Sequence, residues 1–267
     1  MDSSSFNVLS LCSGVGGLEI GLRRVVPSAR VVCWVEWDVH RIAVLAERME
    51  EKAVDAAPVW TNLYTFDGLP WRGVVDCVVA GYPCQPFSVA GKRSGEEHPE
   101  HLWPQCARVI RESEAEWVLL ENVPGHLSLG FDTVWQELQE MGYRVEAGLY
   151  SAFEAGGTHK RLRLYALGRK PVGNPHTPRL EGWNLTLQQG PDKGITWPPS
   201  PKESTRWRDA IERDWRTAPT LSVVRGSAHG IPDRVDRIKA LGEAASPLTT
   251  ALAVTSLMSR NLARHTL

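Results

Sequence analysis

The sequence predicts an α/β fold, with a mostly parallel sheet in the first 170 residues and a small irregular region after them. Short apolar runs rich in β-branched residues alternate with segments of helical spacing, as in chains that place helices on both faces of a sheet. The texture then changes, because residues 171–201 are rich in Pro, Gly, Asn and Thr. With 267 residues, 42% of them hydrophobic, the chain can bury a large core beside a small second region.

The expected elements follow one another along the chain. The expected strands are 7–11, 30–35, 74–80, 117–120, 143–150 and 163–167. The expected helices of the first part are 18–25, 39–50, 101–114 and 133–141. After the irregular stretch, helical spacing returns at 203–215, 232–241 and 247–262.

Charge is divided unevenly along a chain whose net charge is only −1. Residues 1–150 carry 12 Lys and Arg against 21 Asp and Glu, whereas residues 151–267 carry 18 against 10. This asymmetry favours a face in the second half that meets a polyanion, and the alternative is a chance imbalance between solvated surfaces.

Five cysteines occur without a CxxC pair. Their odd number and wide spacing argue against a disulfide framework and against a zinc site, so we expect no metal. Residues 1–6 lack the basic and apolar regions of a secretory signal, and no stretch is long and apolar enough to span a bilayer. We therefore expect an intracellular, reducing compartment and no membrane contact.

A glycine-rich turn, residues 13–17 (SGVGG), separates the first expected strand from the first expected helix. Glycines let the backbone approach a bound nucleotide closely, and open sheets bind ligands at the carboxyl ends of strands. Glu36 ends the next strand, where an acid commonly accepts hydrogen bonds from ribose hydroxyls. The spacing is not the strict GxGxxG pattern, so no pyrophosphate is implied, and a structural turn is the alternative.

Residues 81–88 (GYPCQPFS) come directly after the expected strand 74–80. Pro83 and Pro86 would hold Cys84 in a rigid, exposed turn at the same edge of the sheet. Core packing explains such a loop cysteine poorly, and the alternative is a loop cysteine without a role.

Glu121 follows the strand 117–120, and two arginines follow further along the chain. Burial at a strand end can raise the pKa of a carboxyl, which then acts as a general acid, the alternatives being a helix N-cap or a surface acid. If the chain is extended there, Arg161 and Arg163 share one face and could hold a carboxylate or a phosphate. The alternative is that this basic run only forms a solvated face.

In chain order, these motifs resemble those of the DNA cytosine-5 methyltransferases of small bacterial or phage type. Residues 11–17 are similar to the family's cofactor loop, with Cys12 where the family usually has Phe, and Glu36 matches its ribose-binding acid. The match continues with Asn62-Leu63, the pair beside the adenine, with 81–88, the Pro-Cys-Gln loop, and with 121–123, the Glu-Asn-Val motif. Residues 159–163 resemble the Gln-Arg-Arg-x-Arg motif, with His-Lys in place of Gln-Arg. Residues 225–237 resemble the segment that supports the recognition domain, and 241–244 resemble the closing Gly-Asn motif, with Glu243 in place of Asn.

The resemblance implies a Rossmann-like S-adenosylmethionine-dependent methyltransferase sheet with a small, irregular target-recognition domain. Residues 1–170 would form the catalytic and cofactor-binding domain, and 171–228 the target-recognition region. Residues 229–267 would be C-terminal helices that return to the catalytic domain.

The resemblance also implies methyl transfer from S-adenosyl-L-methionine to C5 of a cytosine flipped out of duplex DNA. Addition of a Cys84 thiolate to C6 would make C5 nucleophilic, which requires an accessible, activated cysteine. Glu121 would protonate or hydrogen-bond N3, while Arg163 and Arg161 would steady Glu121 or the base carbonyl. Residues 88–95 would close over the flipped base.

The residues so assigned form three groups. The catalytic residues are Cys84, Glu121, Arg161 and Arg163. The cofactor-binding residues are Leu11, Cys12, Ser13, Gly14, Gly16, Gly17, Leu18, Glu36, Trp37, Asn62, Leu63, Gly81, Pro83, Glu243 and Ala244. The DNA-binding residues are Gln85, Ser88, Lys92 and Arg93.

Duplex DNA is the expected partner, a cognate restriction endonuclease is a further candidate, and we expect a cytoplasmic monomer in a bacterial or phage-infected cell. Three alternatives remain open. An RNA cytosine-5 methyltransferase shares the fold, but its relatives usually carry a Cys-Phe-Thr tripeptide that this sequence lacks. A catalytically impaired DNA-binding relative would not need Cys84, Glu121 and Arg163 together. A dinucleotide oxidoreductase leaves the Pro-Cys-Gln loop unexplained.

Overall fold

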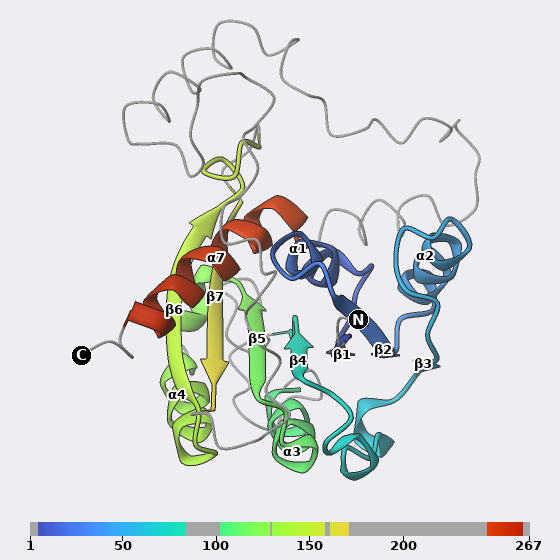
Figure 1. Ribbon diagram of the computed structural model, residues 1–267, viewed down its shortest axis with the longest axis horizontal. Helices are drawn as coiled ribbons and strands as arrows, with labels where there is room; N and C mark the ends of the chain where they lie inside the picture. Colours follow the sequence, from blue (N-terminus) through green and yellow to red (C-terminus); the bar gives the residue numbers. More distant parts are fainter. Residues whose placement is uncertain (1–4, 84–101, 129, 158–160, 171–244, 264–267) are drawn as a thin grey trace, which may run out of the picture.

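The computed structural model describes residues 5–83, 102–128, 130–157, 161–170 and 245–263. Within these ranges a seven-stranded sheet has the order β3-β2-β1-β4-β5-β7-β6 (Figure 1). Its strands are β1 (Phe6–Leu11), β2 (Ala29–Val35), β3 (Val59–Trp60), β4 (Cys77–Ala80), β5 (Trp117–Asn122), β6 (Arg144–Ser151) and β7 (Leu162–Arg169). The first five are parallel, whereas β7 runs antiparallel to both β5 and β6, so the prediction of a mostly parallel sheet is confirmed.

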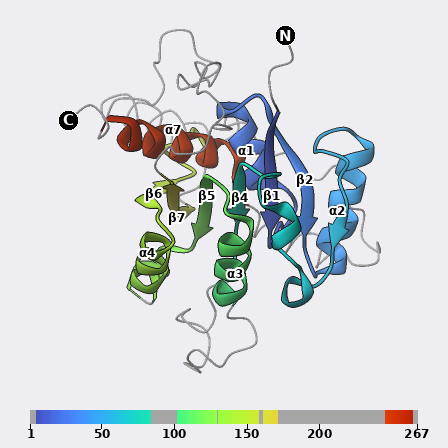
Figure 2. The same ribbon diagram turned by 60° about the horizontal axis from the view of Figure 1, so that its bottom comes forward.

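Helices cover both faces of this sheet. They are α1 (Gly17–Val25), α2 (Val39–Glu50), α3 (Trp103–Ser113), α4 (Phe131–Glu140) and α7 (Pro247–Ala263), with short 3-10 turns η1 (Leu63–Thr65), η2 (Leu69–Trp71) and η4 (Pro124–Ser128). Figure 2 shows α1 and α7 on one side and α3 and α4 on the other. Two apolar clusters match this arrangement, one beneath α1 and α7 and the other beneath α3 and α4.

The central strands are buried on both faces because their side chains alternate between the two clusters. In β4, Val79 packs into the cluster beneath α1 and α7, and Val78 packs into the cluster beneath α3. Both side chains are fully buried. A strand covered on both faces reads as a continuous apolar run, which is why the sequence revealed it.

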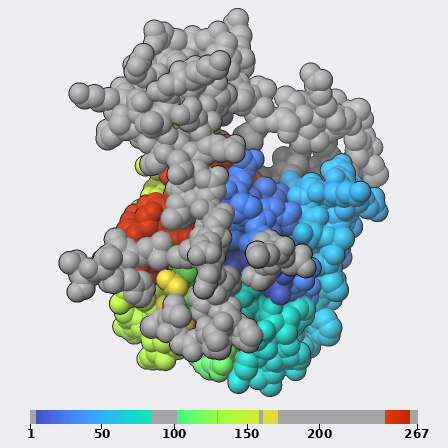
Figure 3. Space-filling view, viewed as in Figure 1, coloured from blue at the N-terminus to red at the C-terminus, as the bar shows by residue number. Residues whose placement is uncertain are grey.

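Two glycines let the last helix approach the first. A Cβ atom at Gly17 would lie 2.3 Å from the carbonyl oxygen of Ala245, and one at Gly21 would lie 2.4 Å from Thr250 Cβ. No side chain fits at such distances, so these positions require glycine. The start of α7 is thereby packed against α1, next to the glycine turn. In the space-filling view α7 adjoins β6, where the Ala147 carbonyl accepts a hydrogen bond from Arg260 (Figure 3).

Most of the expected elements are present, with ends within about two residues of the expected ones. The strand 74–80 is the exception, because it begins only at Cys77. Val74 and Val75 instead donate backbone hydrogen bonds to the Trp71 carbonyl in a turn, and Val74 is 47% exposed. Two residues suffice for β3, too few to produce an alternating pattern. The expected helices 203–215 and 232–241 lie outside the described residues. None of the described helices is long and apolar enough to cross a membrane.

Candidate active site

The glycine turn joins the carboxyl end of β1 to α1 and is tied to the end of β2. Ser13 donates a backbone hydrogen bond to the Val35 carbonyl at 3.1 Å, and Gly16 donates one to Ser13 at 3.1 Å. Gly14 and Gly16 have φ values of 57° and 81°, in the left-handed region that favours glycine. A Cβ atom at Gly14 would meet nothing within 4 Å, so the turn has open space at this point.

Glu36 lies directly after β2 and fastens the glycine turn through its carboxylate. Its Oε2 accepts a hydrogen bond from the Gly14 backbone at 2.7 Å, and its Oε1 accepts from the backbones of Trp37 and Asp38 at 3.0 Å. Burial raises the pKa of Glu36, and these hydrogen bonds oppose the rise. Each carboxylate oxygen can accept more than one hydrogen bond, so the group retains capacity for a ligand hydroxyl.

Two further cofactor candidates lie on the same edge of the sheet, in the segments that follow β2 and β3. Trp37 is 70% exposed and presents an indole ring on which a flat ligand could stack. Asn62 caps η1, and its Oδ1 accepts a hydrogen bond from the Tyr64 backbone at 2.9 Å. Leu63, by contrast, is buried in the core.

Gly81, directly after β4, is the point where the candidate segments converge. A Cβ atom there would lie 3.3 Å from Leu18 Cδ1, 3.8 Å from Glu121 Oε2 and 3.9 Å from the Cys12 carbonyl oxygen. The start of α1, the glycine turn and the end of β5 therefore all lie next to this one glycine.

Glu121 forms a partly shielded ion pair with Arg163 at this point. The Arg163 Nε lies 3.0 Å from Glu121 Oε1, and the two side chains are 19% and 13% exposed. Burial raises the pKa of Glu121, as its place at a strand end predicted, while the charges of Arg163 and Arg161 lower it. Two effects therefore oppose each other at this carboxyl. Burial favours its neutral form, and the two arginine charges favour its ionised form.

Sequence reasoning missed the contacts that anchor the chain just before Cys84. Asn122 donates a side-chain hydrogen bond to the Tyr82 carbonyl at 3.0 Å, and the Tyr82 hydroxyl lies 3.0 Å from His126 Nε2. The only sequence signal for these contacts is that Tyr82 and Asn122 lie within recognised motifs and that His126 follows the second motif closely. The pairing itself depends on packing between distant segments.

Glu19 is a second buried acid that the sequence analysis did not single out. It is 6% exposed on α1, and its Oε1 lies 2.6 Å from the Ser10 hydroxyl, which in turn lies 2.7 Å from the Ser13 hydroxyl. Its Oε2 is buried without a hydrogen-bond partner among the described residues. Burial raises the pKa of Glu19 to about 7.

Four of the five cysteines lie within the described residues, and three of these four are buried. A side-chain hydrogen bond between the thiols of Cys12 and Cys106, together with burial, raises the pKa of Cys12. Burial raises the pKa of Cys33 to about 11 and also raises that of Cys77. Cys106 is fully buried. None of these four is well suited to nucleophilic attack, because three are buried and the half-buried Cys12 has a raised pKa.

Several predicted site residues fall outside the described part of the chain. They are Cys84, Gln85, Ser88, Lys92, Arg93, Glu243 and Ala244. Pro83 is the last described residue before the first group, and Ala245 is the first after the second. The structure therefore brings the glycine turn, Gly81, Glu121 and Arg163 together, and it describes the chain up to one residue before Cys84.

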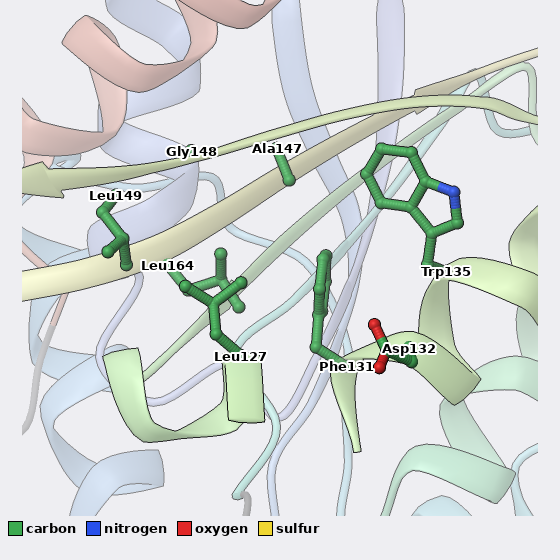
Figure 4. Close-up of a pocket in the computed structure, with 8 residues that line it drawn as sticks. All are labelled: Leu127, Phe131, Asp132, Trp135, Ala147, Gly148, Leu149 and Leu164. Atoms are coloured by element: carbon green, nitrogen blue, oxygen red, sulfur yellow. The ribbon is translucent and has the colours of Figure 1, made fainter. Parts of the chain in front are cut away.

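A separate apolar groove of about 290 Å³ lies at the outer edge of the sheet, between α4, η4 and β6 (Figure 4). It is lined by Leu127, Phe131, Asp132, Trp135, Ala147, Gly148, Leu149 and Leu164. Asp132 is the only ionisable side chain of this lining. The groove therefore lacks the convergent polar groups that are found beside Gly81.

Comparison with known proteins gives a consistent family. A family model described as C-5 cytosine-specific DNA methylase matches residues 6–214. The Type II methyltransferase M.HgiBI of Herpetosiphon aurantiacus is 27% identical over 168 residues, which cover 61% of this chain and 37% of that protein. The Type II methyltransferase M.CviJI of Paramecium bursaria Chlorella virus IL3A is 30% identical over 167 residues, covering 61% and 43%.

The fold has counterparts among solved structures. A DNMT2 of Spodoptera frugiperda superimposes with a TM-score of 0.53 at 20% identity, covering 66% of this chain and 53% of that one. The matched part of this chain spans less than half the length of both Type II relatives.

Proposed function

Because the chain belongs to the C-5 cytosine-specific DNA methylase family, we propose that it transfers a methyl group from S-adenosyl-L-methionine to C5 of a cytosine flipped out of duplex DNA. The observation that carries this proposal is the convergence at Gly81. There the glycine turn and the Glu121–Arg163 ion pair meet at the carboxyl edge of the sheet, two residues before the Pro83-Cys84 dipeptide. Open α/β sheets bind their ligands at this edge.

The residues on this edge fit S-adenosyl-L-methionine. Gly14 leaves open space above the turn, the Glu36 carboxylate can accept hydrogen bonds from ribose hydroxyls, and Trp37 offers an exposed ring for the adenine. Asn62 supplies a polar group beside that ring position. When bound, the cofactor supplies an electrophilic methyl group on a sulfonium. Glu243 and Ala244 would complete this site, since the next residue, Ala245, packs against Gly17.

Cys84 is the proposed nucleophile. Its thiolate adds to C6 of the cytosine, which makes C5 electron-rich enough to accept the methyl group. Loss of the C5 proton and elimination of the thiolate then restore the aromatic ring. The assignment is supported by the four other cysteines, whose burial or raised pKa makes them poor nucleophiles.

Glu121 is the proposed acid for N3 of the same base. Its raised pKa allows it to hold a proton closer to neutral pH than an ordinary glutamate does, and N3 gains electron density as the thiolate adds. Arg163 fixes the carboxyl through Oε1, which leaves Oε2 on the side of Gly81. Arg161 adds a second positive charge that also acts on Glu121.

The DNA contacts follow from charge and chain position. Gln85, Ser88, Lys92 and Arg93 flank the nucleophile in sequence and would contact the target strand. The basic second half of the chain, residues 151–267, would contact DNA phosphates, so the affinity for DNA should fall as the salt concentration rises. Residues 171–228 would recognise the target sequence. A cytoplasmic monomer working beside a restriction endonuclease is part of the same proposal.

The direct test is methyl transfer by Cys84→Ser, because a hydroxyl is a far poorer nucleophile than a thiolate at neutral pH. Labelled S-adenosyl-L-methionine would be offered with duplex DNA and, in parallel, with transfer RNA. We expect the parent to label DNA and the variant to label neither while still binding the cofactor. Labelling of transfer RNA alone would assign the enzyme to RNA, and turnover by the variant would remove Cys84 from the mechanism.

A further inference from the structure

The root of the Cys84 loop is fixed by the segment that carries Glu121. Tyr82 is 3% exposed, its carbonyl accepts a hydrogen bond from Asn122, and its hydroxyl lies 3.0 Å from His126 Nε2. His126 belongs to η4, which begins directly after the Glu121-Asn122-Val123 motif, and it is also 3% exposed. Main chain and side chain of Tyr82 are therefore both held by one short stretch.

Aromatic packing leaves the Tyr82 ring little room to move. Its centroid lies 5.3 Å from that of Trp103 on α3 and 5.7 Å from that of His126. The His126 ring in turn lies 6.0 Å from Phe131 on α4, edge to face. A hydrogen bond enclosed by such apolar rings is strong and directional, because no water competes for either partner.

We propose that His126 is a positioning residue that sets the place of Cys84 relative to Glu121 by holding the Tyr82 hydroxyl. The proposal rests on the proposed function of Cys84. Covalent geometry alone keeps the Cα atoms of Tyr82 and Cys84 within about 7.6 Å. Pro83 lies between them, and its ring fixes one backbone dihedral, so a shift of Tyr82 is transmitted to Cys84.

If His126 has this role, its loss should lower the rate of methyl transfer and leave the affinities for DNA and cofactor nearly unchanged. The thiolate must reach C6 while Glu121 reaches N3 of the same ring, and a misplacement of about 1 Å can cost on the order of 100-fold in rate. Most of the proposed cofactor groups, by contrast, lie on the glycine turn and on the segments after β2 and β3, and Tyr82 itself is not one of them.

The test compares Tyr82→Phe, His126→Leu and His126→Gln in the full chain. Tyr82→Phe removes only the hydroxyl, and we expect the single-turnover rate of methyl transfer to fall about tenfold, with DNA and cofactor dissociation constants within about twofold of the parent. We expect His126→Leu to lower the rate by a similar factor and to leave both dissociation constants similarly unchanged. His126→Gln places an amide where Nε2 stood, so it should restore the rate to within about threefold.

Tyr143→Phe is the matched control. Tyr143 is also 3% exposed, and its hydroxyl donates to the Ala115 carbonyl, at the opposite end of β5 from Glu121. This variant should lower the melting temperature without changing the rate. The inference is overturned if Tyr82→Phe and His126→Leu keep the parent rate, or if Tyr143→Phe slows the reaction equally. In both cases an inactive Cys84→Ser leaves the proposed function standing, whereas an active Cys84→Ser removes the function itself.

Discussion

Glu121 and Glu19 are two shielded carboxyls on the side of the sheet that α1 and α7 cover, with Glu19 buried and Glu121 13% exposed, and their surroundings differ. Glu121 has Arg163 at 3.0 Å and the charge of Arg161 nearby, whereas the Glu19 carboxyl is held by the Ser10 hydroxyl and has one oxygen without a hydrogen-bond partner. Burial is the main cause of the raised pKa in both.

The comparison separates a chemical role from a structural one. Two cations beside Glu121 stabilise its ionised form against the effect of burial, as the proposed role of a group that loses and regains a proton requires. Glu19 lacks such a partner in the described structure, so ionisation there works against folding. Burial alone therefore does not identify a catalytic acid, and the proposal for Glu121 rests on its burial together with the Arg163 guanidinium and the neighbouring Gly81.

The largest expected effect is that of Glu121→Gln. The amide keeps the size of the side chain but cannot deliver a proton to N3, so the single-turnover rate should fall on the order of 100-fold or more, while DNA affinity changes much less. Rapid-quench kinetics and a binding titration would measure the two quantities. A normal rate with weakened binding would assign Glu121 a structural role and erase the contrast with Glu19.

A smaller effect is expected from the charge beside Glu121. The Arg163 charge lowers a pKa that burial raises, so Arg163→Met should raise the pKa of Glu121 further. If Glu121 acts as the proton donor, the rate falls as pH rises through its pKa, and Arg163→Met should move this decline to higher pH. Arg163→Lys keeps the charge and is the control, with the decline near its original position. Identical pH–rate profiles for the parent and Arg163→Met would contradict this account.

The smallest effect on activity is expected from Glu19→Gln, which should change stability instead. The folded pKa of about 7 lies above the ordinary 4.5, so the protonated acid contributes stability fully below pH 4.5 and loses it as pH rises through 7. Relative to the parent, Glu19→Gln should gain about 2–3 kcal/mol in free energy of unfolding at pH 8 and much less at pH 5. Urea unfolding at both pH values measures this gain. A gain independent of pH would show that Glu19 does not ionise in this window.

The sequence predicted the parts of the site that depend on order along the chain. A strand followed by glycines, an acid at the next strand end and a carboxylate after WVLL all lie at the carboxyl edge of a parallel sheet, so the topology brings them together. The Tyr82–His126 contact and the burial of Glu19 could not be predicted, because each depends on packing between segments that no local pattern encodes. The place of β7 between β5 and β6 was missed for the same reason.

The most direct test of the central claim is to trap the covalent intermediate on duplex DNA that carries 5-fluorocytosine at a methylated site. Fluorine cannot leave C5 as a proton does, so the attacking thiol stays bound to C6 after methyl transfer. Digestion and mass spectrometry would identify the modified peptide. We predict an adduct on Cys84 that forms only in the presence of S-adenosyl-L-methionine. An adduct on Cys12, Cys33, Cys77 or Cys106, or methylation of ordinary duplex without any adduct on the fluorinated one, would contradict the account.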